Sequence, residues 1–179
     1  MPAAGVRIAG HGYSVLPPSG EGWTLVRRGP DAAIFGKRRP EAQARRDDGP
    51  YLLLAGVQAL PAERGDDFTI AARQWLIQRL QVPGRQLLTL NLYPSTWQGA
   101  SCVQYQARQV DRYDFIEPRT RFEYDNSGRL CRHPYVSALW IQAFRNARSL
   151  RVEGSTVGWE EAQDFIDHVL LVAPEVERD

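Results

Sequence analysis

The stretch Cys102-Val103-Gln104-Tyr105-Gln106-Ala107-Arg108-Gln109-Val110 decides the fold. From Val103 to Arg108, every odd-numbered residue is apolar or aromatic and every even-numbered residue is polar. Successive side chains of an extended chain point to opposite sides, so this alternation predicts a strand with one buried and one solvated face. A strand of this kind is typical of an antiparallel sheet.

Other segments with the composition of strands flank this stretch on both sides. The pattern predicts strands over residues 23–27, 32–37, 51–60, 87–93, 120–124 and 138–145. Gly29-Pro30-Asp31 predicts the turn of a hairpin between the first two. The run 51–60 is apolar on both sides, which predicts a strand in the centre of the sheet. Asp125-Asn126-Ser127-Gly128 has the composition of a turn.

Two segments show the 3.6-residue period of amphipathic helices, residues 67–81 and 159–172. We expect their apolar stripes to be buried, and these include Phe68, Trp75, Leu76, Phe165 and Val169. Strands outnumber helices and mostly follow one another directly. The fold class predicted is therefore α+β, with one antiparallel sheet and two main amphipathic helices packed on it.

Length and charge limit the classes of protein. A chain of 179 residues fits one domain. We assign residues 1–11 to a flexible leader and residues 12–179 to a single α+β domain. The formal net charge of +1 gives no general attraction to nucleic acid, so no nucleic-acid partner is predicted. No apolar run is long enough to span a membrane, and the first residues lack the apolar region of a secretion signal.

The chain has two cysteines, Cys102 and Cys131. We predict that they form a structural disulfide, and two unpaired thiols are the alternative. A metal site would combine both with His133 and either His11 or His168. The paired spacings of structural zinc sites are absent, so no metal ligand is predicted. A nucleophile pair of a cysteine with His133 is a further alternative.

The motifs of common enzymes are missing from the sequence. There is no G-x-S-x-G, no G-x-G-x-x-G and no phosphate-binding loop with Gly-Lys-Ser/Thr. We therefore predict no catalytic residue and no cofactor, and we favour a protein that is not an enzyme. Pro134 holds the backbone of His133 extended, which favours a shaped loop. Arg132, His133 and Tyr135 are the candidate binding rim.

Several short segments carry a resemblance to known families. Gly12-Tyr13-Ser14, Gly22-Trp23 and Glu161-Ala162-Gln163-Asp164-Phe165-Ile166 resemble the small exported PsbP-like domains. This resemblance implies an antiparallel sheet between helices. Cys131-Arg132-His133-Pro134, followed by the strand at 140–144, is also similar to uncharacterised proteobacterial lipoproteins. Those lipoproteins have a lipidated cysteine near the start, which this chain lacks. Neither group supplies a catalytic motif.

Three hypotheses for function follow from these observations. The first is a non-enzymatic, envelope-associated binding or accessory protein, located in the periplasm, with an unknown protein or small ligand as its partner. The second is a small Cys/His-dependent enzyme or metal-binding protein. The third is a cytoplasmic adaptor with free thiols.

Overall fold

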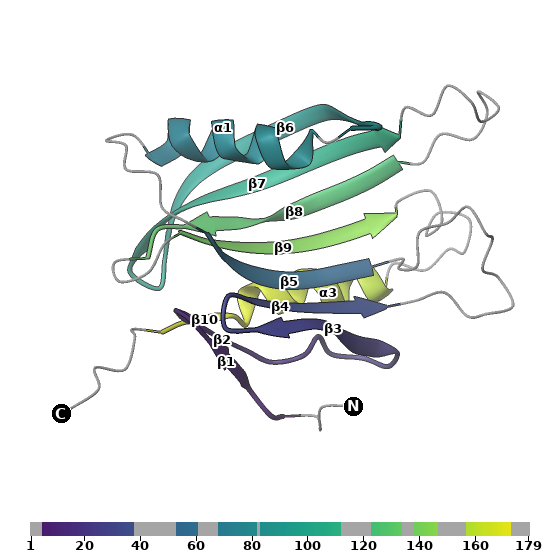
Figure 1. Cartoon of the computed structure of the whole chain (residues 1–179), viewed down its shortest axis with the longest axis vertical. Coiled ribbons are helices and arrows are strands. Elements are labelled where there is room, and N and C mark those ends of the chain that lie inside the picture. Colours follow the sequence, from purple (N-terminus) through teal and green to yellow (C-terminus); the bar gives the residue numbers. More distant parts are fainter. Residues whose placement is uncertain are drawn as a thin grey trace, which may run out of the picture.

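The computed structural model describes residues 5–37, 53–60, 68–81, 83–111, 123–133, 138–146 and 157–172. These residues form two antiparallel sheets and two helices (Figure 1). The helices are α1 (Phe68–Leu80) and α3 (Val157–Asp167). The strands are β1 (Ile8–Gly10), β2 (Tyr13–Val15), β3 (Trp23–Gly29), β4 (Ala32–Lys37), β5 (Leu53–Leu60), β6 (Arg85–Trp97), β7 (Ala100–Asp111), β8 (Glu123–Cys131), β9 (Ala138–Asn146) and β10 (Leu170–Leu171).

The large sheet has seven strands in the order β3-β4-β5-β9-β8-β7-β6. All of its neighbours are antiparallel. Strand β5 lies in the interior of this sheet, as its apolar residues on both sides predict. The predicted α+β class, with an antiparallel sheet and two helices packed on it, is therefore confirmed. The small sheet, in the order β1-β2-β10, was not predicted.

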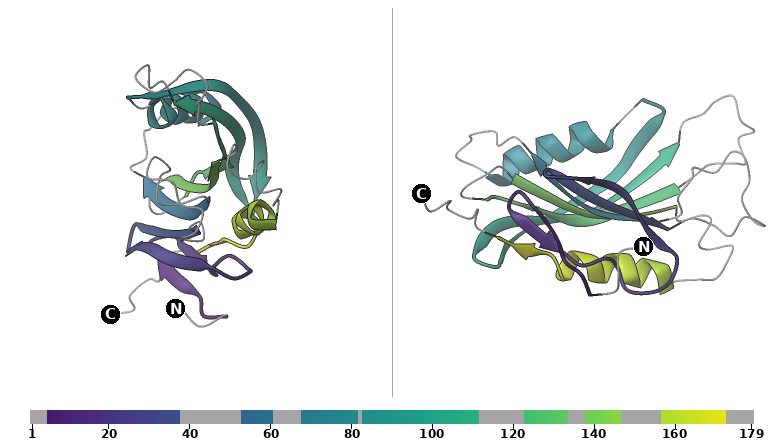
Figure 2. Two further views of the ribbon diagram at one scale, coloured as in Figure 1. Left: turned by 90° about the vertical axis from the view of Figure 1, so that its right-hand side faces the viewer. Right: turned by 60° about the horizontal axis from the view of Figure 1, so that its bottom comes forward.

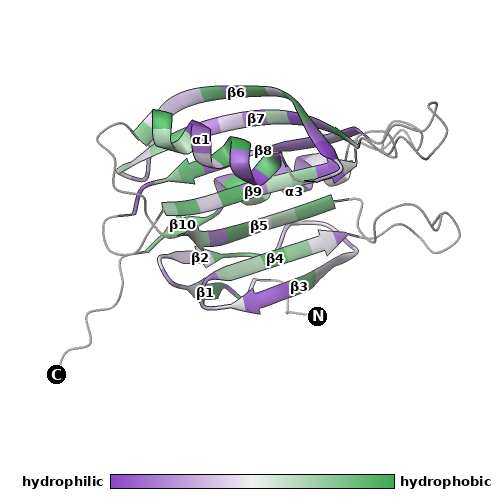
Figure 3. Ribbon diagram, turned by 45° about the horizontal axis from the view of Figure 1, so that its top comes forward, coloured by the Kyte–Doolittle hydropathy of each residue, from purple (hydrophilic) through white to green (hydrophobic). Residues whose placement is uncertain are grey.

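The two helices pack on opposite faces of the large sheet (Figure 2). Alternate residues of β9 show this directly. Leu139 and Ile141 belong to the apolar cluster that includes Phe165 of α3, whereas Trp140 belongs to the cluster that includes Leu76 of α1. Figure 3 shows α1 banded with hydrophobic and hydrophilic residues, as expected of a helix with one buried side. The small sheet packs beside α3, because Tyr13 and Val15 of β2 are in the α3 cluster.

The burial of the apolar helix residues and the end of the second helix differ in part from the sequence expectations. Leu76, Phe165 and Val169 are buried as predicted, but Phe68 and Trp75 are only partly buried. The second helix ends at Asp167 and not at residue 172. The residues after it pair with β2 instead, which places Leu170 opposite Ser14.

The chain start also differs from the expectation of a leader over residues 1–11. Ile8–Gly10 form β1, and Ile8 is buried in the α3 cluster. Burial of this one large apolar side chain and pairing with β2 are the physical reasons for order there. The assignment of residues 12–179 to one domain stays a prediction.

The predicted turn at Asp125-Asn126-Ser127-Gly128 is wrong, because these residues lie inside β8. Asn126 and Gly128 each satisfy a requirement of the sheet interior. Asn126 is buried and hydrogen-bonded. At Gly128 a Cβ atom would clash with the backbone carbonyl oxygen of Ile141, so no side chain fits there. The turn-forming composition thus reflects tertiary constraints on a strand.

A buried polar network crosses the strands on the α1 side of the sheet. The Tyr105 hydroxyl donates to Asn126 Oδ1 and accepts from Trp140 Nε1, at 2.7 Å for the second bond. Asn126 Nδ2 donates in turn to Gln142 Oε1 at 3.2 Å. Burial raises the pKa of Tyr105 well above its ordinary value of 10.0. The hydroxyl therefore stays protonated in the folded protein at pH values where an unfolded chain ionises it.

We predict that Tyr105→Phe lowers the free energy of unfolding by about 1–3 kcal/mol, because Trp140 Nε1 and Asn126 Oδ1 lose a buried partner. The raised pKa also means that wild-type stability is intact below pH 10 and falls as the pH rises beyond it. This fall should be shallower in the variant. Urea unfolding at pH 7, 9 and 10.5 measures both effects. Tyr93→Phe, at an exposed hydroxyl, is the control. Equal stability of Tyr105→Phe and wild type at pH 7 would contradict the prediction.

Candidate binding face

On one side of the large sheet, helix α3 contacts β5, β9 and β8, and the small sheet packs near β4. Among the described residues, no helix or second sheet lies over β6 and β7 there. We call the side chains that β6, β7 and β8 present there the open polar face. Its members are Thr89, Asn91, Tyr93, Gln104, Gln106, Arg108, Asp125 and Ser127, and their common side follows from the register of the three strands. The even-numbered polar residues of β7, which the sequence identified as solvated, form its middle row.

The open polar face is exposed to solvent. Gln104, Gln106 and Arg108 are exposed along β7, and Tyr93 of β6 retains 54% of its accessible surface. The same strands bury Val103 and Tyr105 on their other side, against α1. A buried opposite side fixes the register of the strands. The polar side chains therefore stand at fixed spacings on a rigid support.

The two arginines that contact Asp125 on this face form ion pairs of different length. Asp125 receives Arg145 Nε on one carboxylate oxygen at 2.7 Å and Arg108 Nε on the other at 3.5 Å. Two guanidinium groups thus share one carboxylate. Arg145 is also stacked over Trp159, with its Cζ atom 4.6 Å from the ring centroid. Arg108 has the longer contact, and its side chain is 50% exposed.

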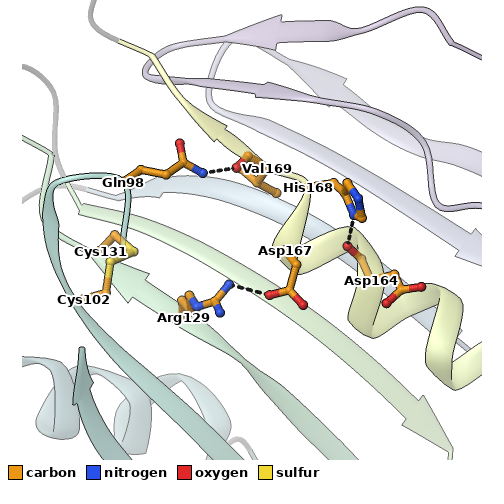
Figure 4. A network of polar contacts seen from close by, with 8 residues as sticks. All are labelled: Gln98, Cys102, Arg129, Cys131, Asp164, Asp167, His168 and Val169. Atoms are coloured by element: carbon orange, nitrogen blue, oxygen red, sulfur yellow. Dashed lines mark hydrogen bonds and ion pairs between the residues drawn. A yellow bond between two sulfur atoms is a disulfide. The ribbon is translucent and has the colours of Figure 1, made fainter. Parts of the chain in front are cut away.

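At the other end of β7, the hairpin that joins it to β6 bends toward the C-terminal end of α3 (Figure 4). Arg129 of β8 forms an ion pair with Asp167 of α3 at 2.8 Å and lies over the Trp97 ring at 4.7 Å. Gln98 Nε2 donates to the Val169 carbonyl oxygen at 2.6 Å. The Leu171 amide donates back to Gln98 Oε1 at 2.9 Å. The hairpin is therefore fixed to the segment that follows α3.

Gln98 occupies an unusual backbone conformation. Its φ is 50° and that of Gly99 is 75°, so both central residues of this two-residue hairpin have positive φ. Such turns favour Asn, Asp and Gly, and glutamine is uncommon there. The two side-chain hydrogen bonds to the α3–β10 segment account for a glutamine at this position.

The structure places Cys102 and Cys131 directly opposite each other on β7 and β8 and joins them as a disulfide. Both side chains are buried, at 2% and 0% exposure. Cys131 is the last residue of β8. The position of the bond is thus that of a structural cross-link. Its formation in the protein in solution stays a prediction.

The candidate rim residues Arg132, His133 and Tyr135 are not brought together by what the structure describes. Arg132 lies over the Phe68 ring of α1, with its Cζ atom 5.0 Å from the centroid. His133 Nε2 is 2.9 Å from the carbonyl oxygen of Val172, after β10. Tyr135 lies outside the described residues. The rim therefore stays a prediction, and the open polar face is the stronger candidate site.

The remaining histidines of the metal hypothesis lie in separate places. His11 Nδ1 is 3.0 Å from Asp31 Oδ1, and His168 Nδ1 is 2.7 Å from the Asp164 carbonyl oxygen. Within the described ranges, no group of three His, Cys, Asp or Glu side chains is arranged to hold a metal ion. A thiolate–imidazole pair of Cys131 with His133 would first require the bond to Cys102 to open.

No helix in the described part of the chain is both long enough and apolar enough to cross a membrane.

The fold is shared with solved structures of Mog1 proteins. A mutant of the protein Mog1 aligns with a TM-score of 0.57 and 11% identity, covering 94% of this chain and 96% of that chain. The Ran-binding protein Mog1p of Saccharomyces cerevisiae aligns with a TM-score of 0.56 and 10% identity, covering 93% of this chain and 95% of its own. At these identities the likeness concerns the fold. No family model matches the sequence. No curated protein matches it either.

These findings correct the family resemblance predicted from the sequence. The assignment to PsbP-like exported domains and to proteobacterial lipoproteins is wrong, because the structural neighbours are Mog1 proteins across nearly the whole chain. The shared segments have ordinary structural roles here. Tyr13 begins β2, Trp23 begins β3, and residues 161–166 are part of α3. The assignment to the periplasm rested in part on that resemblance and is withdrawn with it.

We predict that reduction of the Cys102–Cys131 pair lowers the melting temperature by roughly 10 °C. Closing a loop with a sequence separation of 29 residues stabilises a chain by roughly 3–4 kcal/mol in the loop-entropy model, and each kcal/mol corresponds to about 2–4 °C at this size. Melts with and without reductant measure the shift. Thiol titration of denatured protein, purified without reductant, should find no free thiol.

The double variant Cys102→Ala, Cys131→Ala is the control, since its melting temperature should not respond to reductant. Two free thiols per chain together with identical melts would reject the disulfide.

Proposed function

We propose that this protein is a non-enzymatic binding protein and that the open polar face docks a protein partner. The observation that carries the proposal is the sharing of one carboxylate, Asp125, by Arg108 and Arg145, beside an exposed row of uncharged polar side chains. Arg108 has one long ion-pair contact to a carboxylate that Arg145 also binds at a shorter distance. Its guanidinium is the best placed group on this face to accept a carboxylate from a partner.

The surrounding residues suit the rest of such an interface. Gln104, Gln106 and Asn91 offer amide donors and acceptors, and Tyr93 offers an exposed ring with a polar end. Aromatic residues and arginine are enriched in protein interfaces. The description of Mog1p as a Ran-binding protein supports the same kind of role for this fold. The partner of the present protein is proposed as a protein on these grounds.

We further propose that the protein is an adaptor located in the cytoplasm and not in the cell envelope. The likeness to Mog1p supports it, whereas the envelope hypothesis has lost the resemblance on which it was partly based. Cytosolic thiols are kept reduced, so this location predicts that Cys102 and Cys131 are thiols in the cell and pair on oxidation. Alkylation of thiols in intact cells, before lysis, tests the location. A fully oxidised pair under those conditions would contradict it.

The experiment for the open polar face has two stages. A photo-crosslinking residue, benzoylphenylalanine, replaces Gln106 in one strain and Arg73, on the exposed side of α1, in another. We expect a discrete protein adduct at position 106 that is absent at position 73. The captured protein is then identified, purified and titrated with the purified chain.

In that titration, Arg108→Glu should weaken binding by at least about tenfold, because a charge reversal places two carboxylates against each other. Arg73→Glu is the matched control, since it makes the same charge change on the other side of the sheet, and its affinity should be unchanged. Equal loss in both variants, or an adduct at position 73 alone, would overturn the proposal. Circular dichroism confirms that both variants are folded.

A further inference from the structure

Strand β6 is the last strand of the large sheet on one side, and among the described residues no strand pairs with its outer edge. It spans 13 residues and is bonded on its inner side to β7 over nearly its whole length. An edge strand of this length presents a row of backbone amide and carbonyl groups to the outside.

The register shows which backbone groups point outward. The Arg132 amide donates to the Ser101 carbonyl oxygen, so Ser101 faces β8 and the next residue, Cys102, faces β6. The Cα atoms of Cys102 and Cys131 are 4.1 Å apart, as expected of a pair that exchanges no backbone hydrogen bonds. Backbone direction alternates along a strand. Thr89, Asn91 and Tyr93, opposite even-numbered residues of β7, therefore bond to β7.

The backbone groups of Leu90, Leu92, Pro94 and Thr96 consequently point to the outer edge. Proline lacks an amide hydrogen, and its position in β6 is one that the ladder to β7 tolerates. The other irregularity is the bulge between Leu87 and Thr89. A proline and a bulge are both features that block pairing at sheet edges. They stand on either side of residues 89–93, which we call the edge window.

The edge window itself lacks such protection. No charged residue occurs between Arg85 and Arg108, so the edge has no charge to repel a second strand. Charged side chains on edge strands are the common means of preventing unwanted pairing. Leu90 and Leu92 are partly buried against the α1 cluster on one side, while Asn91 and Tyr93 are exposed on the other. The window thus has an apolar and a polar side.

We propose that the edge window binds an extended segment of a partner protein by strand addition. The amide and carbonyl groups of Leu90 and Leu92 would supply four backbone hydrogen bonds. The bound segment would alternate in type, with apolar residues beside Leu90 and Leu92 and polar residues beside Asn91. This site is distinct from the charge cluster at Arg108, and either can fail without the other.

The size of the window favours a peptide segment over a second copy of this chain. Five residues in extended conformation span roughly 17 Å. A stable dimer buries about 800 Å² on each partner, which a contact of this length does not provide. Strand addition by a peptide needs less area, because main-chain hydrogen bonds supply much of the affinity.

Amide exchange in the wild-type protein is the first test. The amides of Leu90 and Leu92 should exchange rapidly in the free protein, while those of Asn91 and Tyr93 are protected by β7. The probe is the synthetic peptide acetyl-Lys-Thr-Val-Thr-Val-Thr-Lys-amide, added in an NMR titration. We expect it to slow exchange at Leu90 and Leu92. Slow exchange at both amides in the free monomer would overturn the proposal, because the edge would then already be covered.

The matched pair Leu92→Pro and Leu92→Ala isolates the backbone contribution. Both variants lose the leucine side chain, but only the first loses the outward amide. Loss of one hydrogen bond weakens peptide binding by roughly three- to tenfold, so Leu92→Pro should bind that much more weakly than Leu92→Ala. A peptide of the same composition with its valines adjacent should bind more weakly to wild type.

Equal affinity of the two variants would reject strand addition at this edge. Analytical ultracentrifugation of the wild-type protein tests whether a second copy of the chain occupies the edge window instead. A wild-type dimer that Leu92→Pro converts to a monomer would replace the partner segment by a second copy of the chain.

Discussion

Two helices are too narrow to cover both faces of the large sheet, and this constraint shapes the rest of the molecule. Six spacings between seven strands make the sheet roughly 29 Å wide, whereas a helix with its side chains is about 10–12 Å across. On one face, α3 lies over β5 and β9, and the small sheet packs beside it near β4. The strands beyond β9 on that face present mostly polar side chains to solvent.

Exposure of this side to solvent explains why β7 and β8 carry glutamine, serine and arginine beside buried tyrosine and leucine. Each strand packs apolar side chains against α1 on one side and exposes polar side chains to solvent on the other. The charges of this side are tied to neighbouring elements, by Arg129 to α3 and by Arg145 to Asp125. Arg108 is the arginine with the longer contact to Asp125. Arg129 and Arg145 each also contact α3, through Asp167 and Trp159.

The sequence predicts those features that local patterns determine. Taken together, the alternation in β7, the apolar run of β5 and the two helical stripes were sufficient to predict the fold class. Features that depend on distant residues were missed. Asn126 and Gly128 resemble a turn until Tyr105 and the Ile141 carbonyl group are placed beside them. Likewise, the short strands β1, β2 and β10 have too few residues for a recognisable period. The open polar face was visible as a solvated row in β7, but its charge cluster required Asp125 and Arg145 from other strands.

The pairing of β10 with β2 has a consequence for synthesis of the chain on the ribosome. Ile8, Val15 and Val169 share one apolar cluster, although more than nine-tenths of the described sequence separates the first from the last. The N-terminal strands therefore emerge long before their final partner, and their apolar side chains stay accessible during translation. Contacts between residues so distant in sequence also slow folding. A nascent chain halted before residue 169 should thus be a substrate for chaperones, with the α1 half of the sheet already able to form.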